Sequence, residues 1–172
     1  MKAYIGLTCK VGAYNRVLGA LLDLNIPQGD IFLLFGPIDI LVQFTEFKNL
    51  EEFIQTWFNP VRIIGAEEAL ITRTLTFIVI SEGPLFAEEP FAFLFLNTQP
   101  RNLENARRAL LSIPEVLSAD TVFGPYDVVC PVKVNDATEL EQVISDIHDK
   151  VSGIEGTMTT IVANFPSNHI IE

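Results

Sequence analysis

The stretch Phe35-Gly36-Pro37-Ile38-Asp39 decides the fold, because it occurs a second time as Phe123-Gly124-Pro125-Tyr126-Asp127. The two glycines are 88 positions apart (36 to 124), and three flanking pairs recur at nearly the same distance. These pairs are Ala3-Tyr4 with Ala92-Phe93, Ile26-Pro27 with Ile113-Pro114, and Leu50-Glu51 with Leu140-Glu141. Loop insertions produce small drifts of this kind. We therefore predict a duplication of one unit of about 80 residues.

The segment between the two copies has the composition of a linker. Residues 82–90 contain two prolines, a glycine and three glutamates, which interrupt helices and strands alike. We therefore predict a first domain at residues 1–81 and a linker at 82–90. A second domain, with a C-terminal tail, is predicted at residues 91–172.

Each copy has the hydrophobic pattern of strand, helix, strand, strand, helix, strand. The expected strands are residues 3–7, 31–35, 38–44 and 70–80 in the first copy, and 91–96, 117–123, 126–134 and 157–163 in the second. The expected helices are residues 14–24, 50–58, 103–113 and 138–151. Asn49 with Glu52, and Thr138 with Glu141, are typical of capping boxes. Pro60 is expected to end the helix that begins at Leu50.

The element order is the ferredoxin-like split arrangement, in which two helices cover one face of a four-stranded antiparallel sheet. The other face of such a sheet normally carries polar side chains toward water. Residues 31–35, 77–80 and 91–96 are instead apolar on both faces. At roughly 25 cal/mol per Å² of apolar surface, leaving these strands wet would cost several kcal/mol. We therefore predict an α+β fold in which tandem ferredoxin-like βαββαβ repeats pack sheet to sheet as an intrachain dimeric α+β barrel.

Composition excludes several classes of protein. Hydrophobic residues make up 49% of the 172 residues, which is too many for a disordered chain and favours burial of further surface in a homo-oligomer. The net charge of −11, with 11 Lys and Arg, argues against direct nucleic-acid binding, which depends on neutralising phosphates. No apolar run approaches the roughly 20 residues of a membrane span, and no signal peptide is visible. We expect a cytoplasmic protein.

The residues that usually carry chemistry form no catalytic or metal-binding set. Cys9 and Cys130 are expected to be buried free thiols, and neither they nor His148 and His169 have a partner at metal-ligand spacing. No nucleophile elbow or glycine-rich phosphate loop occurs. We expect no catalytic residue, no metal and no cofactor. An enzyme of the α+β barrel type stays open as a third class of function, one that a polar pocket inside the barrel would favour.

The repeated Gly-Pro-x-Asp loop has two interpretations. As a turn, it uses glycine for a positive φ, proline to fix the chain direction and aspartate to bond the backbone. As a site, it presents the Asp carboxylate at a hairpin tip to a ligand ammonium group, while nearby backbone N–H groups bind the ligand carboxylate. Pro37 and Pro125 each remove one such donor.

The second copy resembles the effector domain of the Lrp/AsnC family of transcription regulators over nearly its whole length. The family pattern is Pro-x-Val, a strand, Gly-x-Tyr-Asp, an amphipathic helix and a Thr-rich final strand. The stretches that match are residues 113–116, residues 121–129 with Gly124, Tyr126 and Asp127, and residues 156–162. The first copy is similar, with Ile38 where the family usually has Tyr, and with Thr72-Arg73-Thr74-Leu75 in its final strand.

The resemblance implies a small-molecule effector, an amino acid or a related compound, bound where pairs of these domains meet. Gly124, Tyr126 and Asp127 would line one site, together with Thr159 or Thr160. Gly36 and Asp39 would line the other site, where Ile38 offers no hydroxyl group.

The resemblance also bears on partners. Family regulators carry an N-terminal helix-turn-helix, whereas this sequence begins directly with a predicted strand. We expect a small-molecule-sensing regulatory module without its own DNA-binding domain, which acts on a helix-turn-helix regulator by mixed assembly. The alternative is an interaction module whose repeat only builds an oligomer.

Overall fold

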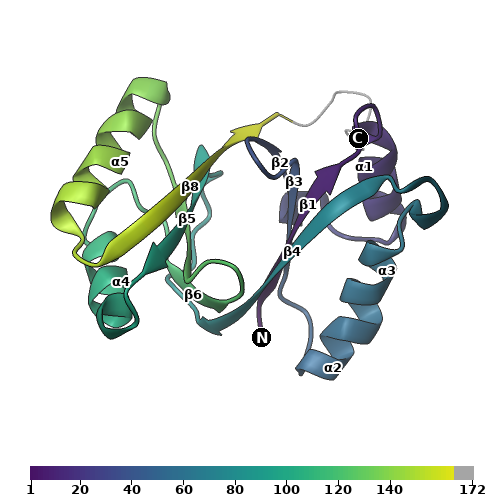
Figure 1. Cartoon of the computed structure of the whole chain (residues 1–172), viewed down its shortest axis with the longest axis horizontal. Coiled ribbons are helices and arrows are strands. Elements are labelled where there is room, and N and C mark those ends of the chain that lie inside the picture. The colour runs from purple at the N-terminus through teal and green to yellow at the C-terminus, as the bar shows by residue number, and fades with distance from the viewer. Residues whose placement is uncertain (165–172) are drawn as a thin grey trace. The chain divides into compact units, whose positions relative to one another are not determined.

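The computed structural model describes residues 1–164, so the predicted tail and His169 lie outside the described residues. The chain divides into two compact units. Of the described residues, one unit consists of 1–77 together with 163 and 164, and the other consists of 78–162. Figure 1 follows the chain from the first unit (purple to blue) into the second (green to yellow).

The first unit follows the predicted order of elements. Its strands are β1 (Ala3–Cys9), β2 (Ile31–Phe35), β3 (Ile40–Phe44) and the first part of β4 (Ile71–Ser81). Its helical elements are α1 (Tyr14–Asp23), η1 (Gln28–Asp30), α2 (Leu50–Phe53), η2 (Ile54–Phe58), α3 (Asn59–Arg62) and η3 (Ala66–Glu68). The strands lie in the order β4-β1-β3-β2, and β3 pairs antiparallel with both β1 and β2.

The second unit repeats this arrangement. Its strands are β5 (Ala92–Thr98), β6 (Asp120–Phe123), β7 (Val128–Val132) and β8 (Ile154–Ala163). Its helical elements are η4 (Pro100–Asn102), α4 (Leu103–Leu111) and α5 (Ala137–Lys150). The strand order β8-β5-β7-β6 places the fourth strand of the unit next to the first, as in the first unit. The mixed α+β fold with antiparallel strands is confirmed. The tandem duplication and the barrel between the units stay predictions.

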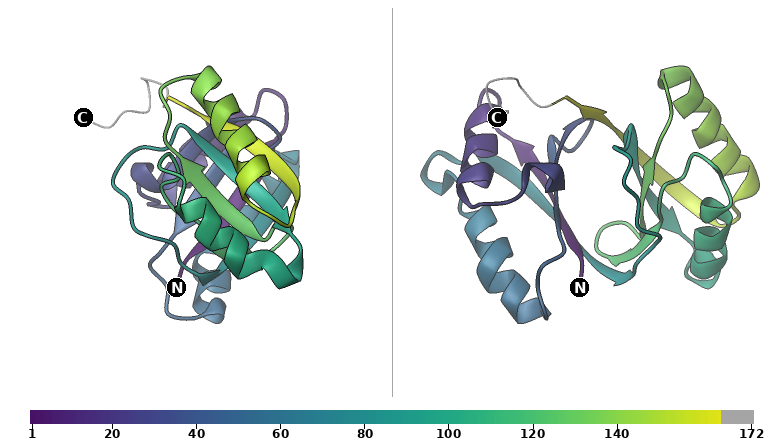
Figure 2. Two further views of the ribbon diagram at one scale, coloured as in Figure 1. Left: turned by 90° about the vertical axis from the view of Figure 1, so that its left-hand side faces the viewer. Right: turned by 180° about the vertical axis from the view of Figure 1, so that it is seen from behind.

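Helices α4 and α5, at the front of the left-hand view of Figure 2, cover one face of the second sheet, and a core of apolar side chains holds them there. Leu140, Val143 and Ile147 of α5 are buried in this core, and so are Leu94 and Leu96 of β5. Full burial of one such side chain stabilises a fold by about 1.5–3 kcal/mol. The predicted helical spacing of α5 therefore corresponds to its core contacts.

Helix capping follows one pattern in both units, although the predicted cap of α5 is wrong. Asn49 accepts a hydrogen bond from the Glu52 amide at 2.9 Å, which confirms the first capping box. In the second unit the cap is Asp136, which accepts from the Glu139 amide at 2.9 Å, and not Thr138. Asp136 has an extended backbone, as an N-cap requires, whereas Thr138 already lies inside the helix.

Pro60 does not end its helix, contrary to the prediction. Residues 54–58 form a π-helical turn, in which the Asn59 amide donates to the Ile54 carbonyl, and α3 then continues through Pro60 to Arg62. Proline normally breaks a helix because it lacks an N–H and contacts the carbonyl of residue i−4. In this helix the proline follows directly after a π-turn, which already changes the hydrogen-bonding pattern, and it occupies the first turn of the next α-helical segment.

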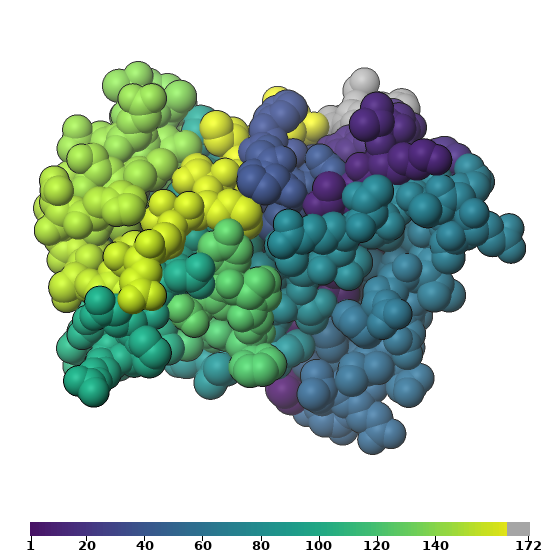
Figure 3. All heavy atoms as spheres, in the orientation of Figure 1, coloured from purple at the N-terminus to yellow at the C-terminus, as the bar shows by residue number. Residues whose placement is uncertain are grey.

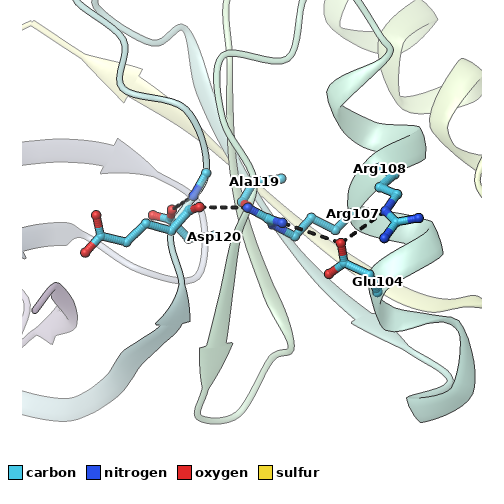
Figure 4. A network of polar contacts seen from close by, with 7 residues as sticks. Glu104, Arg107, Arg108, Ala119 and Asp120 are labelled. Carbon is cyan, nitrogen blue, oxygen red and sulfur yellow. Dashed lines mark hydrogen bonds and ion pairs between the residues drawn. The ribbon is translucent and has the colours of Figure 1, made fainter.

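The predicted linker leaves β4 and is held at once by the second unit (Figure 4). Residues 82–90 form no helix or strand. The Gly83 amide donates to the buried Asp120 carboxylate at 2.8 Å. Arg107 donates to the Glu82 carbonyl at 2.7 Å and to the Ala119 carbonyl at 3.1 Å. The start of this segment is therefore a fixed part of the second unit.

The boundary between the two compact units falls inside β4. The first part of β4 belongs to the first unit, and Ile78, Val79 and Ser81 pair with β6 in the second. Among residues 1–164, no helix is long and apolar enough to cross a membrane.

Candidate functional site

The first Gly-Pro-x-Asp loop is tied to the end of β1 by Asp39. The Asp39 amide donates to the Leu7 carbonyl at 2.9 Å, and the Asp39 carbonyl accepts from the Leu34 amide at 2.8 Å. The carboxylate oxygen Oδ2 accepts from the Cys9 amide at 2.7 Å. These three bonds connect β1 to both strands of the β2–β3 hairpin. Asp39 therefore has a clear structural role.

The second loop has the same three bonds, made by Asp127. Its amide donates to the Leu96 carbonyl and its carbonyl accepts from the Val122 amide, both at 2.9 Å. Its Oδ2 accepts from the Thr98 amide at 2.8 Å. These contacts support the turn interpretation as far as aspartate is concerned. Gly36 has the positive φ that this interpretation requires, at 148°, whereas Gly124 does not.

One oxygen of each aspartate remains for another partner. Asp39 and Asp127 are both half-buried, and the Oδ1 atom of each makes no hydrogen bond within residues 1–164. A carboxylate whose second oxygen is fixed by a backbone amide is held in position. Such a group suits recognition of a cation. The geometry is therefore compatible with the ligand interpretation of both loops.

Tyr126 distinguishes the second loop from the first. Its ring is half-buried and lies 5.9 Å from the ring of Phe95, centroid to centroid. Ile38, its counterpart, is a fully buried apolar side chain at 1% exposure. A loop residue with a hydroxyl group is thus present at the second loop only.

Thr160 and Thr159 lie on opposite faces of the second sheet. Thr160 pairs with Phe93, is buried, and donates from Oγ1 to the Phe93 carbonyl at 3.2 Å. Phe93 and Phe95 are two positions apart, so Thr160 shares the sheet face on which Tyr126 packs. Thr159 pairs with Leu94, which faces the helices. The predicted set therefore brings Tyr126 and Thr160 to one face of the sheet and leaves Thr159 on the other.

Three residues near the loops were not predicted as site residues. Cys9 and Thr98 donate to the two aspartates and are equivalent in the repeat, 89 positions apart like Ala3 and Ala92. This common offset in the repeat is the sequence signal by which Cys9 and Thr98 could have been predicted as a pair. The Thr98 hydroxyl is buried without a hydrogen-bond partner in the described part of the chain. Tyr14, the first residue of α1, could not have been found from the repeat, because its counterpart carries no hydroxyl group.

Tyr14 and Cys9 are uncharged at neutral pH. Burial, and then the Asp39 charge, raises the pKa of the Cys9 thiol to about 11. Burial, followed by the charges of Cys9 and Asp39, raises the pKa of Tyr14 to about 12. A thiol with a raised pKa is a poor nucleophile. The first loop therefore has neighbours that can form hydrogen bonds but are not activated for covalent chemistry.

Each loop is bordered by an exposed aromatic residue. Phe35 and Phe123, the residues just before the two glycines, are 69% and 74% exposed. Thr159 is half-buried on β8, which reaches the surface of the second unit (yellow in Figure 3).

Cys130 is buried, Cys9 is half-buried, and both are free thiols. Among the described residues, no three His, Cys, Asp or Glu side chains gather as metal ligands.

The two loops lie in α+β units, and comparisons with known proteins find a similar family for the second half of the chain. Residues 91–169 match the family model of the Lrp/AsnC ligand binding domain. Two uncharacterized HTH-type transcriptional regulators, from Pyrococcus abyssi and Pyrococcus horikoshii, are each 32% identical to this chain over 76 residues. That stretch is 44% of this chain and 48% of each relative, so the chain spans about half the length of these relatives.

A solved structure shows the fold over a longer range. The crystal structure of a siroheme decarboxylase in complex with an iron-uroporphyrin III analogue covers 95% of this chain and 71% of its own. Its TM-score is 0.58 and its sequence identity is 8%. At this identity the likeness concerns the fold alone. Residues 91–169 are thus similar to the Lrp/AsnC ligand binding domain, and the equivalent assignment for the first half stays a prediction.

Proposed function

We propose that this chain is a small-molecule-sensing regulatory module whose effector is an amino acid, and that it acts by binding and not by catalysis. The observation that carries the proposal is the Asp127 carboxylate. It lies beside Tyr126 within the part of the chain that matches the Lrp/AsnC ligand binding domain, with one oxygen fixed and the other available.

The proposed recognition assigns one role to each group. Asp127 Oδ1 accepts from the ligand ammonium group, because a charge-assisted bond to a fixed carboxylate is among the stronger polar contacts. The Tyr126 hydroxyl donates to the ligand carboxylate. Pro125 has no N–H, so backbone donors come from other loop positions. In the first loop Asp39 provides the equivalent carboxylate, whereas Ile38 offers no hydroxyl group to the ligand.

The proposed partners are further copies of this chain or a helix-turn-helix regulator. Phe35 and Phe123 stand exposed beside the two loops, where a second molecule would cover them. In this scheme ligand binding at the loops changes assembly, and the partner contacts the nucleic acid. The net charge of −11 argues against direct contact by this chain.

A thermal-shift screen of the amino acids tests the proposal. A ligand at 100 times its dissociation constant stabilises the folded state by about 2.7 kcal/mol. For a chain of this length that corresponds to a rise of roughly 5–10 °C in Tm. A positive result is a rise of this size for one amino acid or a chemically related group. The absence of any rise across the complete set at millimolar concentration contradicts the proposal.

An oligomerisation module that binds no small ligand is the second candidate. The observation that favours it is the structural use of Oδ2 in both aspartates, which explains the repeated Asp without a ligand. This function predicts a negative amino-acid screen together with an oligomer that dissociates when Phe35 and Phe123 are both replaced by Ser. Analytical ultracentrifugation of that double variant tests the oligomer, and the amino-acid screen separates the two functions, because only the sensing module predicts a positive result.

A further inference from the structure

A small pocket in the first unit lies at the end of the β2–β3 hairpin opposite to its Gly-Pro-x-Asp loop. Its walls include Asp30 at the end of η1, Gln43 and Phe44 at the end of β3, Glu46 and Trp57. The free volume is about 80 Å³, whereas one water molecule needs roughly 10–15 Å³. The pocket therefore has room for a molecule of a few non-hydrogen atoms.

The indole N–H of Trp57, a residue of the pocket wall, is an unsatisfied hydrogen-bond donor. Nε1 is buried and has no partner within residues 1–164. More than about nine in ten buried polar groups do have a partner, so an orphan donor needs an explanation. Trp57 belongs to the π-turn η2, and its ring lies 5.4 Å from the ring of Phe44. π-turns occur frequently at functional sites.

Two carboxylates stand close together at the same pocket. Partial burial, and then the charge of Glu46, raises the pKa of Asp30. The Gln43 amide donates to Asp30 Oδ1 at 3.5 Å, and this bond and the Lys2 charge act in the opposite direction. The like charges of Asp30 and Glu46 disfavour each other, so a cationic group between them would be stabilised by both.

Three residues of the pocket, Gln43, Glu46 and Trp57, are particular to the first unit, whereas Asp30 corresponds to Ser118, which is also polar. In the second unit, the repeat places apolar residues at the same positions. They are Pro131 for Gln43, Val134 for Glu46 and Ile147 for Trp57. Val134 and Ile147 are buried in the second core. The same fold is thus built with apolar side chains at three of these four positions in the second unit, so Gln43, Glu46 and Trp57 are not required by the fold.

We propose that this pocket binds a small primary amine that also carries a hydrogen-bond acceptor, such as an amino alcohol or an amino amide. The ammonium group lies between Asp30 and Glu46, and the acceptor atom takes the Trp57 indole N–H. This site is independent of the proposed function at the Gly-Pro-x-Asp loops, because it lies at the other end of the hairpin.

The test uses the fact that Trp57 is the only tryptophan of the chain. The full chain labelled with ¹⁵N gives a single indole N–H signal, which is followed while ethanolamine or glycinamide is added. We expect a saturable shift of this signal with at least one of the two. Propylamine has the charge but no acceptor, and we expect it to bind at least about tenfold more weakly.

Variants assign the effect to the pocket. Asp30→Asn and Glu46→Gln should each weaken binding by about tenfold or more, because each removes one charged partner of the ammonium group. Glu141→Gln, which changes an exposed acid on α5, is the matched control and should bind like the unchanged chain. Trp57→Phe keeps the aromatic wall and removes the donor, so calorimetry should show weaker binding. Three results would each contradict the proposal: a linear, non-saturating shift of the indole signal, equal binding of propylamine, or unchanged affinity in both acid variants.

Discussion

Asp39 and Asp127 occupy the same position in the two loops and use one carboxylate oxygen in the same way. What differs is the residue before each of them, Ile38 or Tyr126, and the residue that donates to each, Cys9 or Thr98. The two aspartates therefore share one structural role, whereas the residues around them differ between the two units.

Replacing Asp127 by Asn tests the ligand role of the second loop. Asn keeps an oxygen that can accept from the Thr98 amide, so the free energy of unfolding should change by no more than about 1 kcal/mol. The charge is lost, and affinity for an amino acid found in the screen should fall about tenfold or more, measured by calorimetric titration. Asp39→Asn should have a smaller effect, because Ile38 offers no hydroxyl. Unchanged affinity in both variants would leave the loops as turns.

The Cys9 thiol should react with iodoacetamide far more slowly than an exposed cysteine. Its pKa is raised from 9.0 to about 11, so the thiolate fraction at pH 8 is about a hundredfold lower than for an unperturbed thiol. The rate should rise about tenfold per pH unit until the pH approaches 11. Peptide mass spectrometry follows the modification, and the buried Cys130 serves as the internal reference. A rate at pH 8 equal to that of a free cysteine peptide would contradict the raised pKa.

At the scale of elements, the second helix of each unit shows which signals a sequence carries. Asn49 is predicted correctly as the cap because it lies directly before the apolar stripe that begins at Leu50, with Glu52 three positions further on. Thr138 and Glu141 satisfy the same pattern two positions too late. The chain begins its helix at Asp136 because Glu139 can then also accept from the Asn135 amide, at 2.7 Å. Two overlapping patterns compete here, and only the backbone geometry separates them.

Asp136→Ala should therefore destabilise the protein more than Thr138→Ala. The first variant removes the side chain that accepts from the Glu139 amide, and loss of such a cap costs about 1 kcal/mol. The second changes a position inside the first turn and should cost less than about 0.5 kcal/mol. Urea unfolding monitored by circular dichroism measures both. Equal effects would return the cap to Thr138.

The rule that proline interrupts a helix predicts a helix end at Pro60, but the rule does not hold at this position. The rule assumes that the helix stays α-helical, and no sequence signal announced the π-turn at Ile54–Phe58. The same turn holds Trp57, a residue that the periodicity assigns to the core stripe. Its unsatisfied indole nitrogen appears only in three dimensions. The helix could be predicted from spacing, whereas the pocket could not.

Gly83→Ala should disturb the start of the 82–90 segment. A Cβ atom at this position would lie 2.2 Å from Ser118 Oγ and 2.6 Å from the Ala119 amide nitrogen. The segment must then move, which strains the bond from the Gly83 amide to Asp120. We expect a loss of about 1–3 kcal/mol in the free energy of unfolding. Gly29→Ala, where a Cβ meets nothing within 4 Å, is the matched control in thermal unfolding.

At the scale of the whole molecule, the repeat in the sequence predicts the element order of both units. The pair of Gly-Pro-x-Asp stretches was sufficient, since it aligned every strand of one half with a strand of the other. The division of the chain was less accessible. Composition pointed to residues 82–90, whereas the contacts divide β4 itself. Composition gives no sign of this division, because no proline or glycine interrupts the strand between Ile71 and Ser81.

The net charge of −11 predicts that the chain does not bind duplex DNA near physiological salt. A DNA-binding surface needs clustered Lys and Arg to displace counterions, and the 11 basic residues here are outnumbered two to one by Asp and Glu. A gel shift with micromolar protein should therefore show no retarded band in 150 mM salt. A complex that resists moderate salt would overturn this prediction.

The course of β4 has a consequence for anyone who wishes to produce the second unit as an isolated fragment. A fragment that starts at Phe91, where the predicted repeat begins, omits Ile78, Val79 and Ser81 and so removes one of the two strands that pair with β6, leaving only β7. An unpaired strand edge is a template for association with other chains. The fragment would also lack Gly83, the partner of Asp120, and would leave a buried carboxylate without that donor. A start at Ile78 retains both, so the two fragments should differ sharply in solubility although they contain the same complete repeat.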